Sequence, residues 1–338
     1  MTIDRILLAH GSGGMLSHEL IRDLFLHHLA NPQLAQMADA AVLDDLPPGR
    51  VALTTDSYVV QPLFFPGGDI GELAVCGTVN DLAVMGARPI YLTAGFILEE
   101  GLAFEALERV VVSMAQTARI AGVRIATGDT KVVNRGAADG LFINTAGVGV
   151  IPPGINLGPH RIQSGDAILV NGTLGDHGIA VIMKREGMSF GSALESDTAP
   201  LNGLIEALLT ALPDQIHWMR DPTRGGLATV LNEWAETAGI GIELTEAAIP
   251  VREEVRAACE FLGLDPLYAA NEGKVVLAVD ASAAETALEI LKVHPLGRDS
   301  ATIGRVTDAH PGHVILETPY GARRIIQMLT GAQLPRIC

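Results

Sequence analysis

The sequence predicts an α/β protein (α+β in the arrangement of its layers) with two domains and a short tail. Apolar runs of strand length alternate with stretches whose apolar residues recur every three or four positions, a pattern typical of this class. The chain has 338 residues, and a single domain commonly has about 150. Proline and glycine interrupt the pattern over residues 151–159, as expected of a linker. We therefore expect domains over residues 1–155 and 156–330, and a tail over 331–338.

In the first half, the expected elements follow from spacing and from helix-breaking residues. A helix should follow the glycine loop of residues 10–14, because Leu20, Leu24 and neighbouring apolar residues recur at helical spacing. A helix over residues 72–86 should end before Pro89, which cannot continue it. The other elements predicted here are strands over 51–56, 90–96, 124–127 and 141–150, and an amphipathic helix over 104–120.

The second half repeats the alternation and ends without it. The predicted strands cover residues 167–170, 274–279, about 302–306 and about 313–317, and the predicted helices cover 178–186, 203–212, 225–238 and 283–293. Residues 331–338 show no periodicity, and Gly331 and Pro335 favour a flexible, extended tail over a closing helix.

The charge balance excludes several classes of partner. Lys and Arg total 23 and Asp and Glu total 39, which gives a net charge of −16. Such an acidic chain lacks the basic surface that binds nucleic acid nonspecifically, and it should be repelled by anionic membranes.

The apolar stretch of residues 6–9 is too short for a signal peptide, and no run approaches the ~20 apolar residues of a membrane span.

The three cysteines, Cys76, Cys259 and Cys338, form no disulfide framework. Their sparse use fits a reducing compartment, so we expect a cytoplasmic protein. Cys76 and Cys259 lie in apolar or helical stretches and are expected to be buried. Cys338 differs because it is the last residue of the chain.

Short polar clusters lie at the ends of the predicted elements. Asp56, Asp81 and Asp129 each adjoin an apolar run, where a carboxylate is costly unless a partner compensates for its desolvation. Mg²⁺ bound to nucleotide phosphates is a natural partner, since it prefers hard oxygen ligands. Lys131 could then contact a phosphate, and the glycines of residues 10–14 could bring backbone N–H groups close to phosphate oxygens.

Each cluster also has an ordinary explanation. An Asp after a strand is more often a turn former or a helix N-cap. Arg224 could be a surface residue at the start of a helix, and Glu272 with Lys274 could be a weak strand-edge pair. His177 is expected to lie in a turn. The number of such clusters at element ends, rather than any one of them, favours a functional site.

The sequence resembles the HypE family of hydrogenase-maturation proteins, within the superfamily of aminoimidazole ribonucleotide synthetase and selenophosphate synthetase. The resemblance runs essentially end to end. The motifs that carry it include residues 10–14 (His-Gly-Ser-Gly-Gly), 76–81 (Cys-Gly-Thr-Val-Asn-Asp), 127–133 (Thr-Gly-Asp-Thr-Lys-Val-Val), 174–178 (Leu-Gly-Asp-His-Gly), 271–274 (Asn-Glu-Gly-Lys) and 335–338 (Pro-Arg-Ile-Cys). The last motif singles out HypE within the superfamily.

The resemblance implies a PurM-like fold, a homodimer and a reaction. The N-terminal domains of two subunits would share a β-barrel, with ATP and Mg²⁺ in a cleft near that interface. HypF would carbamoylate Cys338, and the chain would then use ATP to dehydrate the S-carbamoyl group to a thiocyanate. The cyanide would pass to iron on the HypC–HypD complex and on to a [NiFe] hydrogenase.

The resemblance also suggests roles for individual residues. The metal ligands would be Asp56, Asp81 and Asp129, and the catalytic residues Cys338, Glu272 (general base), Lys131 and Arg224. The nucleotide-binding set would be Gly11, Gly13, Gly14, Asp56, Asn80, Asp81, Gly128, Asp129, Thr130 and Lys131.

Two other functions remain open from the sequence. Another member of the superfamily, such as a selenophosphate synthetase or a small-molecule ligase, would leave the C-terminal Cys338 unexplained. A catalytically idle carrier would hold a cyanide-bearing tail for a partner and would show no ATP turnover dependent on Cys338. A Cys338→Ala variant separates these functions from the dehydratase.

Overall fold

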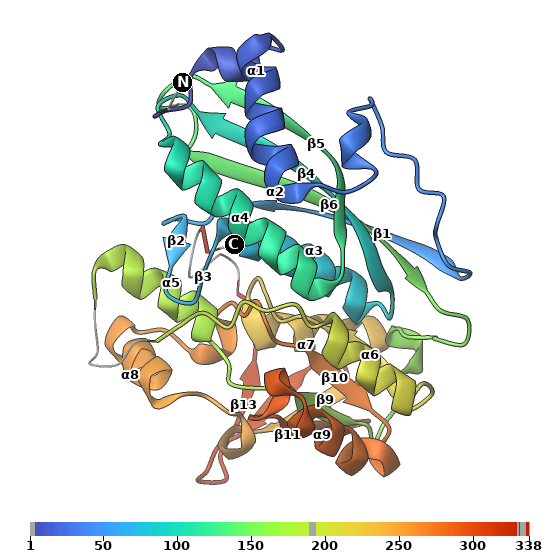
Figure 1. Ribbon diagram of the computed structural model, residues 1–338. Helices are drawn as coiled ribbons and strands as arrows, with labels where there is room; N and C mark the ends of the chain where they lie inside the picture. Colours follow the sequence, from blue (N-terminus) through green and yellow to red (C-terminus); the bar gives the residue numbers. More distant parts are fainter. Residues whose placement is uncertain (1–3, 189–193, 330, 332–335, 338) are drawn as a thin grey trace.

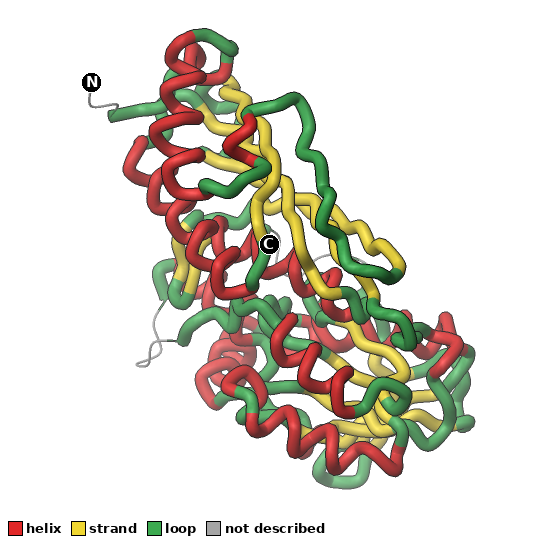
Figure 2. The backbone as a smooth tube through the Cα atoms, turned by 45° about the vertical axis from the view of Figure 1, so that its right-hand side comes forward, coloured by secondary structure: helices red, strands yellow, loops and turns green. Residues whose placement is uncertain are grey.

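The computed structural model describes residues 4–188, 194–329, 331 and 336–337, and it has two α/β domains (Figure 1). Each domain has its own sheet, and the two domains stack end to end along the molecule (Figure 2). Within the described ranges, every helix is too short or too polar to span a membrane.

The first domain contains a four-stranded sheet with the order β1-β6-β4-β5. Its strands are β1 (Arg50–Tyr58), β4 (Arg88–Glu99), β5 (Arg124–Val133) and β6 (Leu141–Ile151). β4 runs parallel to β5 and antiparallel to β6, which in turn pairs antiparallel with β1. Strands β1 and β5 are therefore the two edges of this sheet.

Helices α3 (Ile70–Val84) and α4 (Phe104–Ala121) pack on the sheet. The Asp69 carboxylate starts α3 by accepting hydrogen bonds from the backbone N–H groups of Gly71 and Glu72, at 2.7 and 3.1 Å. Gly71 permits a close approach of the two helices, because a Cβ there would lie 2.3 Å from the Val110 carbonyl oxygen on α4. A further helical stretch runs from α1 (Met15–Leu20) through a π-helical segment (Ile21–Leu26) into α2 (His27–Leu29).

The second domain contains a seven-stranded sheet with the order β13-β12-β9-β11-β7-β10-β8. The strands are β7 (Ala167–Val170), β8 (Ile216–Arg220), β9 (Gly241–Thr245), β10 (Val276–Val279), β11 (Ala301–Thr307), β12 (Val314–Glu317) and β13 (Arg323–Ile326). All four residues of β7 and of β10 are buried, so this part of the sheet is covered on both faces.

The described part of the second domain also contains the helices α5 (Asp176–Glu186), α6 (Asn202–Ala211), α7 (Gly226–Ala238), α8 (Glu253–Leu262) and α9 (Ala284–Val293). One core cluster joins α7 to one side of the sheet. A second cluster joins α6 and α9 to the sheet and includes Ala83 and Val84 from α3. Helix α3 of the first domain therefore contributes to the core of the second.

Two asparagine side chains also connect the domains. The Asn80 amide on α3 donates to the carbonyls of Ala199 and Glu272, at 3.0 and 3.1 Å, and accepts from the Leu201 N–H at 2.7 Å. The Asn202 amide on α6 donates to the Ala121 carbonyl at 2.9 Å. We refer to the region between the domains as the seam.

A short hairpin of the first domain reaches the second at another place. Strands β2 (Phe64–Phe65) and β3 (Gly68–Asp69) form this hairpin, and the Ser196 N–H donates to the Pro66 carbonyl at 2.8 Å. The ring of Phe65 packs edge-on against His177 on α5, with centroids 5.4 Å apart.

The fold class predicted from the sequence is confirmed, and so are most elements. One prediction is wrong in a way that affects the site: residues 128–131 do not follow a short strand but lie inside β5, which continues to Val133. The sequence prediction also missed strands β2, β3, β8, β9 and β13, and it indicated helix α8 only as a helical stretch around Cys259. Cys76 and Cys259 are buried, as expected.

Candidate functional site

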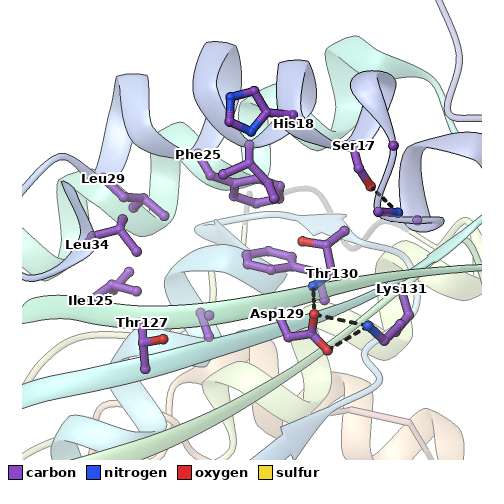
Figure 3. A pocket seen from close by; sticks show the side chains of 17 residues that line it. Ser17, His18, Phe25, Leu29, Leu34, Ile125, Thr127, Asp129, Thr130 and Lys131 are labelled. Atoms are coloured by element: carbon purple, nitrogen blue, oxygen red, sulfur yellow. Dashed lines mark hydrogen bonds and ion pairs between the residues drawn. The ribbon is translucent and has the colours of Figure 1, made fainter. Parts of the chain in front are cut away.

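A pocket lies between the N-terminal helical stretch and strand β5, and its volume is about 270 Å³ (Figure 3). Apolar side chains line its floor, among them Phe25, Leu29, Leu34 and Ile125. The glycine loop and the polar part of β5 complete the lining with seven of the predicted nucleotide-binding residues: Gly11, Gly13, Gly14, Gly128, Asp129, Thr130 and Lys131.

Local folding brings the glycine loop against β5. Gly11 packs so closely on β5 that a Cβ would lie 2.5 Å from the Val132 backbone nitrogen. Gly13 has a φ of +80°, which glycine adopts without strain, and its N–H donates to the Ser17 hydroxyl at 3.3 Å. The loop therefore presents backbone at the mouth of the pocket.

The charged groups of this pocket are exposed. Lys131 Nζ lies 3.1 Å from one carboxylate oxygen of Asp129 and 3.2 Å from the other. An ion pair with both partners in solvent contributes little to stability. Lys131 can therefore exchange Asp129 for a phosphate at small cost, and the apolar floor suits the flat face of a base.

A second group of predicted residues lies at the seam. Asp81 on α3 accepts a hydrogen bond from the Thr54 hydroxyl at 2.8 Å. Asp56 on β1 accepts one from the Arg224 guanidinium of the second domain at 3.1 Å. Burial raises the pKa of Asp81, and the nearby carboxylate of Asp56 raises it further. Burial, followed by the charge of Asp81, raises the pKa of Asp221 to about 7.

Glu272 is buried in the same seam, at 3% exposure. Its Oε1 atom has no hydrogen-bond partner among the residues that the structure describes. Burial raises the pKa of Glu272 well above its usual range, and the charges of Asp221 and Asp197 add to the effect. The seam thus gathers carboxyl groups whose charged forms a bound cation would stabilise.

The Asp197 carboxylate supports the segment that carries Glu272. It accepts hydrogen bonds from the N–H groups of Glu272 and Gly273, both at 3.2 Å, and pairs with Lys274 Nζ at 2.8 Å. Although burial opposes the charged form, Lys274 and the other partners hold the pKa of Asp197 below its ordinary value. The sequence analysis missed Asp197, because it lies in a stretch without periodicity or motif.

The end of the chain reaches the seam as well. Ile337 is 3% exposed and belongs to the same apolar cluster as Val181 and Ala270. Its carbonyl lies 2.9 Å from His177 Nε2. Cys338, the residue on which the predicted chemistry depends, lies outside the described residues. His177 was expected only in a turn, and its contact with a residue 160 positions away has no signal in the sequence.

Within one chain, the structure separates one predicted metal ligand, Asp129, from the other two. Asp129 pairs with Gly95, Gly95 with Asn144, and Asn144 with Ser57, so Asp129 and Ser57 are three strands apart. Three strand spacings amount to about 14 Å. Within one chain, Asp129 is therefore not brought to Asp56 and Asp81, because β5 and β1 are opposite edges of the sheet. Nor do three or more His, Cys, Asp or Glu side chains converge as a metal site anywhere in the described part of the chain.

The residues at the seam still fit Mg²⁺. Mg²⁺ in nucleotide sites is commonly held by one or two carboxylates together with phosphate oxygens and water. Asp56 and Asp81 supply two such carboxylates, and a bound cation would stabilise the charged form of Asp81, whose pKa burial raises. By contrast, the predicted role of Asn80 in nucleotide binding has no geometric support, since its amide already bonds three backbone groups across the seam.

The fold and the site define a two-domain protein related to AIR synthase. Two domain-family models match the chain: "AIR synthase related protein, N-terminal domain" over residues 37–151 and the corresponding C-terminal domain over 163–317. The chain is 54% identical to carbamoyl dehydratase HypE of Azotobacter vinelandii over 331 residues, which covers 98% of this chain and 96% of that protein. It belongs to the HypE family of hydrogenase-maturation proteins.

Further similarities agree with this assignment. Carbamoyl dehydratase HypE of Escherichia coli K12 is 52% identical over 340 residues, covering 99% of this chain and all of that protein. A crystal structure of hydrogenase maturation protein HypE in complex with ATP has a TM-score of 0.94 and 52% identity, covering 98% of this chain and 99% of that one. A crystal structure of a HypE–HypF complex has a TM-score of 0.81 and 50% sequence identity, covering 92% of this chain and 99% of that one.

Proposed function

We propose that this protein dehydrates an S-carbamoyl group on its own Cys338 to a thiocyanate, at the expense of ATP. The observation that carries the proposal is the burial of Ile337 at the seam that also holds Glu272. The residue that follows Ile337 is the cysteine to be modified. Membership of a family whose relatives are named carbamoyl dehydratases supports the same reaction.

The chemistry requires activation of a poor leaving group. Transfer of the γ-phosphoryl group of ATP to the carbamoyl oxygen forms an O–P bond and releases ADP. Loss of one N–H proton gives the phosphorylated imidate, and loss of the second N–H proton closes the C≡N bond as the C–O bond breaks and phosphate leaves. Catalysis therefore needs a bound triphosphate, charge neutralisation and a base close to the carbamoyl nitrogen.

The pocket beside β5 is the proposed nucleotide site. Its apolar floor would hold the base, while the backbone of Gly11, Gly13 and Gly14 and the ammonium of Lys131 would hold phosphates. The HypE–ATP complex, which has the same fold, supports ATP as the ligand.

Mg²⁺ is proposed at Asp56 and Asp81, where it would neutralise phosphate charge. Arg224, paired with Asp56 across the seam, would add positive charge on the same side. Glu272 is the proposed base, since its buried Oε1 has no partner among the described residues, and once it is ionised, a carboxylate of raised pKa is a stronger proton acceptor.

We also propose that two copies form the complete site. The nucleotide pocket and the acidic seam lie at opposite edges of one sheet, so a second copy is needed to bring the two together. The exposed face of β1 supports such a contact, because Val51 and Leu53 on it are 64% and 74% exposed. A β-barrel shared between two such sheets would cover these side chains.

The proposed partners follow from the family. HypF would load the carbamoyl group, as the HypE–HypF complex suggests, and the HypC–HypD complex would accept the cyanide for a [NiFe] hydrogenase. The reaction would take place in the cytoplasm.

Intact mass spectrometry tests the proposal directly. The protein is incubated with HypF, carbamoyl phosphate and ATP–Mg²⁺, and the mass of its C-terminal peptide is followed. We expect a carbamoyl adduct on Cys338 that then loses one water, and no adduct in a Cys338→Ala variant. A Glu272→Gln variant should stop at the carbamoyl adduct while it still binds ATP.

Two outcomes would overturn the proposal. An adduct that never loses water, with all components present, would identify a carrier. Activity that survives Cys338→Ala would point to a small-molecule reaction of the wider superfamily.

A further inference from the structure

We infer that His177 is a positioning residue that holds the C-terminal tail in the seam through a hydrogen bond to the Ile337 carbonyl. The inference rests on the proposed function, since it assigns a purpose to a contact of the tail that is to be modified. His177 lies in the first turn of α5, 160 residues before Ile337.

The two ring nitrogens of His177 have different partners, and together they determine the tautomer. Nε2 lies 2.9 Å from the Ile337 carbonyl oxygen, which can only accept a hydrogen bond, so Nε2 carries the proton. Nδ1 lies 2.8 Å from the Ser196 hydroxyl, which can donate to it. Burial lowers the pKa of His177 and favours this neutral form.

The ring itself is held firmly. Phe65 of the first domain packs edge-on against it, with the two ring planes at 89°. The Ser196 hydroxyl also contacts the Thr198 hydroxyl at 2.7 Å. His177 is therefore fixed on both sides before the tail arrives, so the hydrogen bond costs little side-chain entropy.

Other contacts hold the preceding residue of the tail. The Arg336 carbonyl accepts hydrogen bonds from the Gln61 N–H at 3.3 Å and from the Arg185 guanidinium at 2.5 Å. The Arg336 side chain forms an ion pair with Asp139 of the first domain. Both domains thus contribute to the docked position.

Among these contacts, the hydrogen bond from His177 is the one made to the peptide group directly before Cys338. The Ile337 carbonyl belongs to the peptide group that joins Ile337 to Cys338, and a peptide group is planar. A hydrogen bond to its oxygen therefore restrains the orientation of this peptide group. The Ser196 hydroxyl links His177 to the segment in which Asp197 holds the Glu272 backbone, so the tail and the proposed base share one support.

Two substitutions distinguish the hydrogen bond made by Nε2 from the one made by Nδ1. In His177→Gln the amide nitrogen can take the place of Nε2 and keep the bond to Ile337. In His177→Asn the shorter amide can take the place of Nδ1, which keeps the contact with Ser196 but loses the bond to Ile337. The exposed His27, replaced by Asn, serves as a matched control.

Limited trypsin digestion measures docking without ATP or HypF. Trypsin cleaves after Arg336, but in the docked tail the Arg336 carbonyl is bonded and Ile337 is buried. Loss of the Ile337–Cys338 dipeptide, read from the intact mass, therefore reports undocking. We expect His177→Asn to be cleaved about fivefold faster than the wild type, the effect of losing one ordinary hydrogen bond, and His177→Gln to stay within about twofold.

The single-turnover rate of dehydration at saturating ATP provides the second readout. It should fall by a similar factor in His177→Asn and recover in His177→Gln, while the concentration of ATP needed for half the maximal rate stays unchanged in both. If the Asn variant fails to fold, Ser196→Ala, which leaves the ring without its orienting hydroxyl, should show the same faster cleavage.

The two readouts also separate the inference from the function on which it rests. Equal cleavage rates for the Gln, Asn and wild-type proteins would refute the positioning role, whatever the activity. The expected order of cleavage rates, with no dehydration even in the wild type, would support docking by His177 and refute the proposed function instead.

Discussion

Replacement of Asn80 by Ala should weaken the seam between the domains more than any single exposed substitution. The Asn80 amide is 2% exposed. Removing it leaves the carbonyls of Ala199 and Glu272 and the N–H of Leu201 without their described partner. Water has little access to restore these bonds, because both Leu201 and Glu272 are buried.

The magnitude follows from the number of bonds. A hydrogen bond in a folded protein contributes about 1 kcal/mol net, and an unsatisfied buried partner costs at least as much. Three lost bonds therefore predict a fall of about 3 kcal/mol in the free energy of unfolding. For comparison, Asn144→Ala removes an exposed amide that bonds the Asp56 carbonyl and the Ser57 hydroxyl within the first sheet, and it should cost less than about 1 kcal/mol.

Urea denaturation of the two variants and the wild type measures the difference, and hydrogen exchange locates it. We expect the Asn80 variant to lose amide protection first around residues 199–201 and 271–273. The Asn144 variant should keep wild-type protection there.

Unfolding of the Asn80→Ala variant at the wild-type urea concentration would refute this role of Asn80. If that variant also binds ATP poorly, the sequence-based assignment of Asn80 to the nucleotide site would be right and the structural role assigned to it wrong.

Three further predictions concern the pocket, the exposed sheet face and a half-buried carboxyl group. Lys131→Gln should weaken ATP binding, measured by calorimetry, about tenfold, because one charge-assisted contact is lost. Lys184→Gln, on the exposed end of α5, should leave ATP binding unchanged and serves as the control. Equal affinities for ATP would exclude Lys131 as a phosphate contact. Leu53→Asp should convert a dimer to a monomer in light scattering, because it places a charge in the proposed interface; an unchanged mass would refute that interface. Burial and the charge of Asp69 raise the pKa of Glu72 from 4.5 to about 7. The contribution of Glu72 to the free energy of unfolding is therefore complete below pH 4.5 and is lost as the pH rises to about 7. Thermal melts should therefore show the Glu72→Gln variant gaining stability relative to the wild type across that range, and a constant difference would disprove the shift.

Much of the fold could be predicted because its elements carry strong periodic signals. Helix α4 has one apolar face and ends at Gly122, and strand β7 was predicted at its observed bounds, residues 167–170. Strand β5 was predicted too short because its second half is polar: Asp129 and Lys131 lie on an exposed edge strand, where alternation with a buried face is weak. Strand β8 was missed because polar residues His217 and Arg220 interrupt a run of only five residues.

The candidate site was predictable in its residue types but not in its grouping. The glycine loop and residues 128–131 were assigned together, and the pocket does bring them together. The sequence could not show that Asp129 and Asp56 lie on opposite edges of one sheet, since strand order is a property of the tertiary fold. Nor could it show the contact between His177 and Ile337, which depends on how both domains enclose the end of the chain.

The asparagine contacts at the seam have a consequence for how the protein responds to its surroundings. Amides carry no net charge, do not titrate and are not screened by salt. The hydrogen bonds that Asn80 and Asn202 make between the domains should thus stay equally stable across changes of pH and ionic strength, while the carboxylates beside them respond to both. A frame insensitive to charge, next to a cleft proposed to exchange protons, metal and phosphate, would let that chemistry proceed without loosening the architecture that aligns it.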